Sequence, residues 1–283
     1  MKKSEWSGKP SELLRVDKGF RLAEVDPEAT PGIVATKESG TALLRKNRRA
    51  LARLQGKLFA DSTVGGKRSL LIVLQGMDSS GKGGIVKHAL SAMNSSGVVV
   101  HGFTAPTDEE LRHDFLWRIR KHLPAPGMVS VFDRSHYEDV LAARVQNLAD
   151  PDTIEARYDT IIAFEQEAIA NGTVIVKLML QIGEEQQKKR LVARLHRKSK
   201  LWKYNPSDVD DRERWTALQD AYQIALERTS TAEAPWYVIP ANHKWYARLA
   251  SQEIIMSKLK ELDMNWPRPE YDLDEERGRV AHS

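Results

Sequence analysis

The chain has 283 residues, 41% of them hydrophobic, and a formal net charge of +4. It contains no cysteine, which excludes a disulfide scaffold, a thiol nucleophile and a cysteine-based zinc site. No run of about 18 apolar residues occurs, so we expect no membrane span, and the charged first residues lack the apolar segment of a secretory signal. We expect a cytoplasmic protein whose chain forms one large domain with a substantial core rather than two small domains.

The first part of the chain divides into an arm and a helical segment. Residues 1–35 contain scattered proline and glycine and little periodicity, and we expect an arm that lies on the domain. From Glu38 to Ala60, leucines at helical spacing predict a helix with one apolar face. Its other face is basic and suits either a solvated surface or an anion groove. The basic residues are Arg45, Lys46, Arg48, Arg49, Arg53 and Lys57.

The middle of the chain alternates between predicted strands and helices. The strands are apolar, β-branched runs bounded by turn residues: Ser69–Gln75, Gly97–Phe103, Gly127–Asp133, Thr173–Ile182 and Trp236–Pro240. Helical stretches begin near Gly84, Thr107, Ser135, Asp152, Glu184 and Asp208. This alternation predicts an α/β fold with parallel strands and crossover helices. We predict one domain over residues 36–265 and a polar, frayed tail over 266–283.

The segment from Leu74 to Gly84, LQGMDSSGKGG, matches a phosphate-binding loop (Walker A) except at its last position. Gly83 stands where Ser or Thr would supply a hydroxyl to Mg²⁺. A strand precedes the loop and a helix follows it, the order that such a loop requires; a tight turn without a ligand is the alternative. Backbone N–H groups and the helix N-terminus would bind phosphate. The predicted phosphate-binding residues are Gly76, Met77, Ser79, Ser80, Gly81, Lys82, Gly83 and Gly84.

An acid stands at the end of the third apolar run. In GMVSVFDRSHYEDV, Asp133 has the position of a Walker B carboxylate. A carboxylate is costly to bury unless it meets a cation, and Mg²⁺ bound to phosphate is the natural one beside a phosphate-binding loop. The other interpretation is that Asp133 or Ser135 caps the next helix. Arg134 follows directly and can reach a phosphate.

Residues 188–203 are rich in basic side chains and contain no acidic one. A solvated helix face is the plainer interpretation of such a run. The apolar side of the run and the break at YNPSD favour a mobile lid near residues 194–212, which closes over phosphates and neutralises their charge. The basic residues are Lys188, Lys189, Arg190, Arg194, Arg197, Lys198, Lys200 and Lys203. From Arg194 onward, we assign them to the lid and to polyanion binding.

These elements together resemble the family 2 polyphosphate kinases, which are similar in fold to thymidylate kinase and other P-loop kinases. The resemblance extends from about Leu70 to Leu249 and is carried by GMDSSGKGG, APTDEELRHDFLWRIRKHLP, FDRSHYEDVL, LWKYNPSD and APWYVIPANHKWYARL. It implies a three-layer α/β/α, P-loop kinase-like fold with a five-stranded parallel sheet and a helical lid. It also implies reversible, Mg²⁺-dependent phosphoryl transfer between inorganic polyphosphate and nucleotides.

The resemblance also implies roles for individual residues. Asp78 and Asp133 would serve Mg²⁺ and catalysis, Lys82 and Arg134 would bind phosphate, and Arg194 would reach in from the lid. Asp78 would replace the missing hydroxyl of the loop, and a carboxylate is a stronger Mg²⁺ ligand than a neutral hydroxyl.

The segment DRSHYEDV resembles the subgroup that acts on both nucleoside mono- and diphosphates. Adenine nucleotides are therefore the expected acceptors, guanine nucleotides are expected to react more slowly, and a dimer or tetramer is expected. Two rival functions fit part of the pattern. An ATP-dependent nucleoside monophosphate kinase shares the loop and the lid and differs in its donor. A non-catalytic nucleic-acid-binding P-loop protein would use the basic segments, but aromatic RNA-binding strand motifs are missing, so no nucleic-acid partner is expected.

Overall fold

The computed structural model describes residues 6–283. Its strands are β1 (Ser69–Gln75), β2 (Val98–Gly102), β3 (Val129–Asp133), β4 (Thr173–Gln181) and β5 (Trp236–Pro240). They form one parallel sheet in the order β2-β3-β1-β4-β5. Each strand lies within one of the apolar runs of the sequence, so the predicted α/β fold with five parallel strands is confirmed. β1 lies at the centre of the sheet, and every residue of its apolar run is buried.

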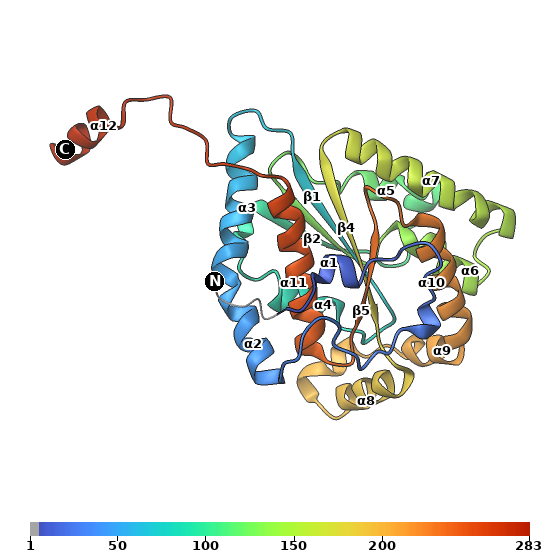
Figure 1. Ribbon diagram of the computed structural model, residues 1–283. Coiled ribbons are helices and arrows are strands. Elements are labelled where there is room, and N and C mark those ends of the chain that lie inside the picture. Colours follow the sequence, from blue (N-terminus) through green and yellow to red (C-terminus); the bar gives the residue numbers. More distant parts are fainter. Residues whose placement is uncertain (1–5) are drawn as a thin grey trace.

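Helices cover both faces of the sheet, as Figure 1 shows. Alternate residues of β1 point to opposite cores, Leu70 and Ile72 to the first and Leu71 and Val73 to the second. The first core is closed by α2 (Lys37–Lys46), α3 (Arg48–Ser62), α4 (Lys82–His88) and α11 (Lys244–Glu261). The second is closed by α5 (Trp117–Arg120), α6 (Ala142–Val145), α7 (Pro151–Ala170) and α10 (Trp215–Thr229). The three predicted layers are therefore present.

The predicted single helix from Glu38 to Ala60 is wrong, because the chain forms two helices that meet at Asn47. The Asn47 amide donates to the Glu253 carboxylate of α11 at 2.6 Å. Helix α2 has its own start, a capping box of Thr36 and Ser39. The break lets the apolar residues of both helices pack into the same core as α11.

Other helices differ from the sequence prediction in length or existence. Near Thr107 the helical structure is limited to a 3₁₀ turn at Glu110–Arg112 and the short α5, and after Ser135 a 3₁₀ turn at His136–Asp139 leads into the short α6. Helix α11 follows β5, where no helix was predicted. The tail was predicted to be frayed, but it contains α12 (Leu273–Ala281), which Figure 1 shows away from the domain.

The N-terminal arm lies along the sheet edge formed by β5. It contains α1 (Pro10–Leu13), and Arg15 forms an antiparallel bridge with Tyr237. The Val16 N–H donates to the Trp236 carbonyl at 2.9 Å, which anchors the arm. Residues 1–5 of the predicted arm lie outside the described residues. Within residues 6–283, no helix combines the length and the apolar character that a membrane crossing would need.

The segment predicted to form the lid lies at the carboxyl end of the strands, at the bottom of Figure 1. It consists of the end of α8 (Glu184–Leu195), a 3₁₀ segment at Lys198–Lys203 and α9 (Ser207–Glu213). Helix α8 is tied to the loop after β1, because the Gln187 side chain donates to the Asp78 carbonyl at 3.0 Å.

Candidate active site

The loop between β1 and α4 has the backbone of a phosphate-binding loop. Gly76 and Gly81 have positive φ angles of 136° and 124°, which other residues rarely adopt. A side-chain carbon at Gly76 would also lie 2.6 Å from the Leu180 carbonyl oxygen. Among the described residues, the N–H groups of Gly81, Lys82 and Gly83 have no hydrogen-bond acceptor. Free N–H groups at a helix start attract an anion.

The serines of the loop turn inward. Ser79 has a φ of 63°, and the Ser80 N–H donates to the carbonyl of Met77, which packs in the second core. Neither serine hydroxyl has a hydrogen-bond partner within the described part of the chain, although both are buried. At Gly83, by contrast, an added side-chain carbon would meet nothing within 4 Å. The position of the missing hydroxyl is therefore sterically open.

Lys82 extends back across the loop. Its side chain is buried, and Nζ donates to the Gly76 carbonyl at 2.7 Å. Gly84, in the first turn of α4, lies close to Arg248 of α11, whose guanidinium is 3.6 Å from a side-chain carbon added at Gly84. Burial and the charges of Arg190, Arg248, Arg197 and Arg194 lower the pKa of Lys244 in the first turn of α11. Helix α11 thus adds two cations to the site that the sequence analysis did not identify.

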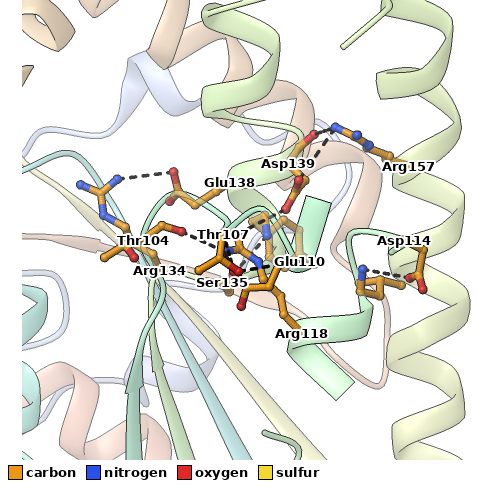
Figure 2. A network of polar contacts seen from close by, with 12 residues as sticks. Thr104, Thr107, Glu110, Asp114, Arg118, Arg134, Ser135, Glu138, Asp139 and Arg157 are labelled. Atoms are coloured by element: carbon orange, nitrogen blue, oxygen red, sulfur yellow. Dashed lines mark hydrogen bonds and ion pairs between the residues drawn. The ribbon is translucent and has the colours of Figure 1, made fainter. Parts of the chain in front are cut away.

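Asp78 and Arg134 meet across the ends of β1 and β3. Arg134 Nη2 donates to Asp78 Oδ1 at 2.6 Å, and Nη1 lies 3.4 Å from Glu138 Oε2 (Figure 2 shows the second contact). Arg134 has a φ of 65°, and its N–H donates to the Leu74 carbonyl at 3.0 Å. Burial raises the pKa of Asp78, but the positive charges of Lys82 and Arg134 outweigh it, so the pKa lies below the usual value.

Asp133 ends β3 beside Leu74 of β1. The predicted alternative of a helix cap belongs to Ser135, whose hydroxyl accepts from the Tyr137 N–H. The partly exposed Asp133 carboxylate makes no hydrogen bond or ion pair with any described residue. It is therefore available to a ligand.

Arg194 reaches toward the loop but is held by the lid itself. Its Nη1 donates to Asp208 Oδ2 at 3.0 Å and to the Lys203 carbonyl at 3.2 Å. Burial and the nearby charge of Asp78 raise the pKa of Asp208 to about 6, although Arg194 acts to lower it. Burial and Asp78 also raise the pKa of Asp211. Sequence reasoning missed both acids; the signal was a cluster of three aspartates, Asp208, Asp210 and Asp211, after a purely basic run.

Four of the predicted lid cations do not reach the loop in this structure. Their side chains are exposed, on or next to the 3₁₀ segment of the lid. Trp202, between two of them, is 77% exposed. The four are Arg197, Lys198, Lys200 and Lys203.

Arg190, which the sequence placed in the same basic run, lies instead behind the phosphate-binding loop. It is buried, and Nη1 donates to the carbonyls of Ser79 and Ser80 at 2.9 and 2.7 Å. Nη2 donates to the carbonyls of Ala241 and Asn242 at 2.6 and 2.9 Å. Burial lowers its pKa to about 10, so it remains charged at neutral pH. Arg190 thus fastens the loop after β1 to the loop after β5.

A second network holds the segment that follows Arg134 (Figure 2). Arg118 of α5 is buried, donates to the Thr104 carbonyl at 2.8 Å, and lies 3.7 Å from Glu110 and 3.9 Å from Asp139. Arg157 of α7 donates to the Asp139 carbonyl at 2.8 Å. Burial raises the pKa of Asp139 to about 6 against the charges of both arginines. The network fastens residues 104–118 beside the end of β3.

Comparisons with known proteins agree with this geometry. Residues 35–267 match the family model described as Polyphosphate kinase 2 (PPK2). A crystal structure of polyphosphate kinase 2 from Arthrobacter aurescens TC1 superposes with a TM-score of 0.96 and 51% identity over 99% of both chains. The AMP/ADP-polyphosphate phosphotransferase of Meiothermus ruber is 40% identical over 91% of this chain and 95% of its own. The ADP-polyphosphate phosphotransferase of Rhodopseudomonas palustris is 36% identical over 89% of each. The chain therefore belongs to the polyphosphate kinase 2 family, as the sequence motifs predict.

Proposed function

We propose that this protein transfers phosphoryl groups reversibly between inorganic polyphosphate and nucleoside mono- and diphosphates. The observation that carries the proposal is the convergence of Lys82, Arg134 and Arg194 with Asp78 and Asp133 at the carboxyl end of the sheet, in a member of the polyphosphate kinase 2 family. The name of the Meiothermus ruber relative supports both AMP and ADP as acceptors.

Phosphoryl transfer passes through a loose transition state, so positioning and charge neutralisation supply most of the catalysis. The free N–H groups of the loop and Lys82 hold the end of the polyphosphate. Lys244 and Arg248 of α11 extend this cationic surface and support the following phosphates. A nucleotide phosphate is already anionic, so no residue has to deprotonate it before it attacks.

Arg134 and Arg194 neutralise the charge that develops on the transferred group. In this structure, Arg134 contacts the Asp78 carboxylate at 2.6 Å, and Arg194 contacts the Asp208 carboxylate at 3.0 Å. Substrate phosphates offer both guanidinium groups a second anion that carries more charge. We therefore propose that substrate binding draws Arg194 from Asp208 toward the loop and that the lid closes with it.

Mg²⁺ belongs to this proposal. It is usually bound by one or two carboxylates together with water and substrate phosphates. In the described part of the chain, no group of three or more His, Cys, Asp or Glu could hold a metal by itself. Asp133 fits as a ligand because its carboxylate is unengaged, and Asp78 fits when Arg134 turns to phosphate. When bound, Mg²⁺ supplies positive charge to the phosphate oxygens.

The test uses polyphosphate as the sole phosphoryl donor, with AMP and ADP in separate reactions. We expect ADP to yield ATP, AMP to yield ADP first and ATP later, and guanine nucleotides to react more slowly. An ATP-dependent nucleoside monophosphate kinase would form no product without ATP. A reaction that stops at ADP, or that ignores AMP, contradicts the dual-acceptor proposal and leaves the family membership intact.

A further inference from the structure

The C-terminal arm, residues 265–283, leaves the domain beside α3 and ends in α12 (Figure 1). Its root is anchored, because Lys57 Nζ donates to the carbonyl of the buried Met264 at 2.6 Å. The Trp266 ring lies 3.1 Å from a side-chain carbon added at Gly56. From residue 267 onward, no hydrogen bond or ion pair joins the arm to residues 6–264.

Helix α12 is marginally stable on its own, although the Asp272 side chain caps its first turn. It has 9 residues with a glycine among them, whereas helices shorter than about 12 residues are marginal in water and an internal glycine costs about 1 kcal/mol relative to alanine. Its ion pairs, Arg277 with Asp274 and Arg279 with Glu276, are exposed and contribute little. The arm also exposes large apolar side chains: Trp266 (50%), Tyr271 (61%), Leu273 (47%) and Val280 (73%). It needs a surface to pack against.

A partly exposed apolar surface lies beside the root of the arm. We define the edge patch as Phe59 of α3 with Val100 of β2, which are 37% and 46% exposed. Val100 points to the same face of the sheet as Val98, which packs against the first core that α3 helps to close. Phe59 is one helical turn beyond Gly56 and 3.2 Å from a side-chain carbon added at Gly97, just before β2. β2 is the edge strand and pairs with β3 alone among the described strands. Valine-rich edge strands are aggregation sites that native proteins cover.

We propose that the C-terminal arm of a second copy of this chain covers the edge patch, in a two-fold pair whose arms are exchanged. A two-fold interface brings the same surface of both copies together. The arm of each copy therefore lands near the root of the other, which is where the edge patch lies.

Charge complementarity also favours the C-terminal arm of a second copy as the segment that covers the edge patch. Arg49 and Arg53 are exposed on α3 and have no ion-pair partner within residues 6–283. The first turn of α12 carries Asp274, Glu275 and Glu276. An arm that crosses the edge patch of a second copy brings these acids toward the basic face of α3.

The direction of the arm is a further argument. The superposition on the Arthrobacter aurescens crystal structure includes 99% of both chains at a TM-score of 0.96. Such a score leaves no room for an arm of this length to point elsewhere. A tail without a docking surface would not keep one direction in two chains that share 51% identity.

Mass measurement by light scattering tests the proposal first. We expect a dimer of the 32.0 kDa chain, or a tetramer of two such dimers. Leu273→Asp with Val280→Asp should halve the assembly mass and leave the far-ultraviolet circular dichroism of the domain intact. Leu148→Asp is the matched control, because Leu148 is 67% exposed in the loop between α6 and α7. A monomeric wild type, or arm variants that keep the wild-type mass, would overturn the proposal.

Crosslinking identifies the surface that the arm contacts. Because the chain lacks cysteine, Val280→Cys can be mixed with Val100→Cys and treated with a short bis-maleimide. We expect a crosslinked dimer in this mixture, and only background when Val280→Cys is mixed with Leu148→Cys. Equal yields in both mixtures contradict the edge patch as the docking surface. If the double variant Val100→Cys/Val280→Cys crosslinks only within one chain, the arm folds back on its own domain and the proposal is wrong. Neither experiment depends on phosphotransfer activity.

Discussion

The Arg134 guanidinium donates to the Asp78 carboxylate at 2.6 Å and joins the loop after β1 to the segment after β3. Arg134 holds this position in a left-handed backbone conformation, which persists only when the surroundings enforce it. The lid repeats the arrangement, because Arg194 contacts Asp208 at 3.0 Å. Each of the two arginines that we propose to act in the transition state thus has a carboxylate partner before substrate arrives, which limits the cost of burying it.

Asp78→Asn should retain the fold but reduce turnover by roughly a hundredfold, a loss of about 3 kcal/mol of transition-state stabilisation. The amide can still accept from Arg134, but it is a poor Mg²⁺ ligand. Excess Mg²⁺ should restore activity only in part. Gly83→Ser has room for its side chain, yet adding it should not rescue the variant fully, because the metal would be held from another side. Turnover against Mg²⁺ concentration is the measurement, and a near-normal Asp78→Asn enzyme contradicts this role.

Arg194→Ala should lower kcat more than it raises KM, because Arg194 acts on charge that develops during transfer. Steady-state kinetics with ADP and polyphosphate separate the two effects. Lys188→Ala provides a control, since it removes a cation from the first half of α8, two turns before Arg194. An unchanged kcat with a raised KM would show that the lid captures substrate electrostatically and does not act in the transition state.

Polyphosphate binding should weaken steeply with salt, because a multivalent anion releases counterions when several cations engage it. The triple change Lys198→Ala, Lys200→Ala and Lys203→Ala should flatten the slope of binding against salt if the lid closes over the chain. A slope that stays the same places the polyphosphate elsewhere, and the basic face of α2 and α3 is then the next candidate. Equilibrium binding at several salt concentrations decides this.

The raised pKa of Asp208, about 6, predicts a pH dependence of stability. An unfolded aspartate titrates near ~3.9, so between about pH 4 and 6 the folded protein binds a proton that the unfolded chain lacks. The contribution of this group to stability is fully present below about pH 4 and is lost as the pH rises through 6.

Asp208→Asn should therefore gain in unfolding free energy relative to wild type as the pH rises from about 4 to 7. Urea unfolding at a series of pH values measures this difference. A difference that does not vary with pH would contradict the raised pKa of Asp208.

Arg190→Lys should destabilise the fold by about 3 kcal/mol or more, because a single ammonium cannot satisfy the carbonyls on both sides. Turnover should fall with it, since the phosphate-binding loop loses its tie to the loop after β5. Thermal unfolding measures the first effect. Lys189→Arg, one residue earlier and exposed, is the control. An Arg190→Lys variant with the wild-type melting temperature would contradict this role.

The strands and the phosphate-binding loop were predictable from sequence because their signals are local. Apolar runs bounded by turn residues mark strands that are buried on both faces, and β1 and β5 have the predicted ends. Gly76 and Gly81 reveal the loop because few other residues adopt its backbone angles. The order of these motifs was enough to indicate the family.

The features that the sequence did not predict depend on contacts between segments that are distant in the chain. The periodicity of apolar residues contains no information about such contacts. The break at Asn47 occurs where α2 and α3 meet α11. Arg190 and Arg194 belong to one basic run, but one is buried behind the loop and the other faces Asp208. Lys244 and Arg248 join the site because α11 crosses the start of α4. The sequence does not show whether a charged residue is solvated or buried. Only the packing of the fold determines which carbonyls and carboxylates its side chain contacts, and therefore what it does.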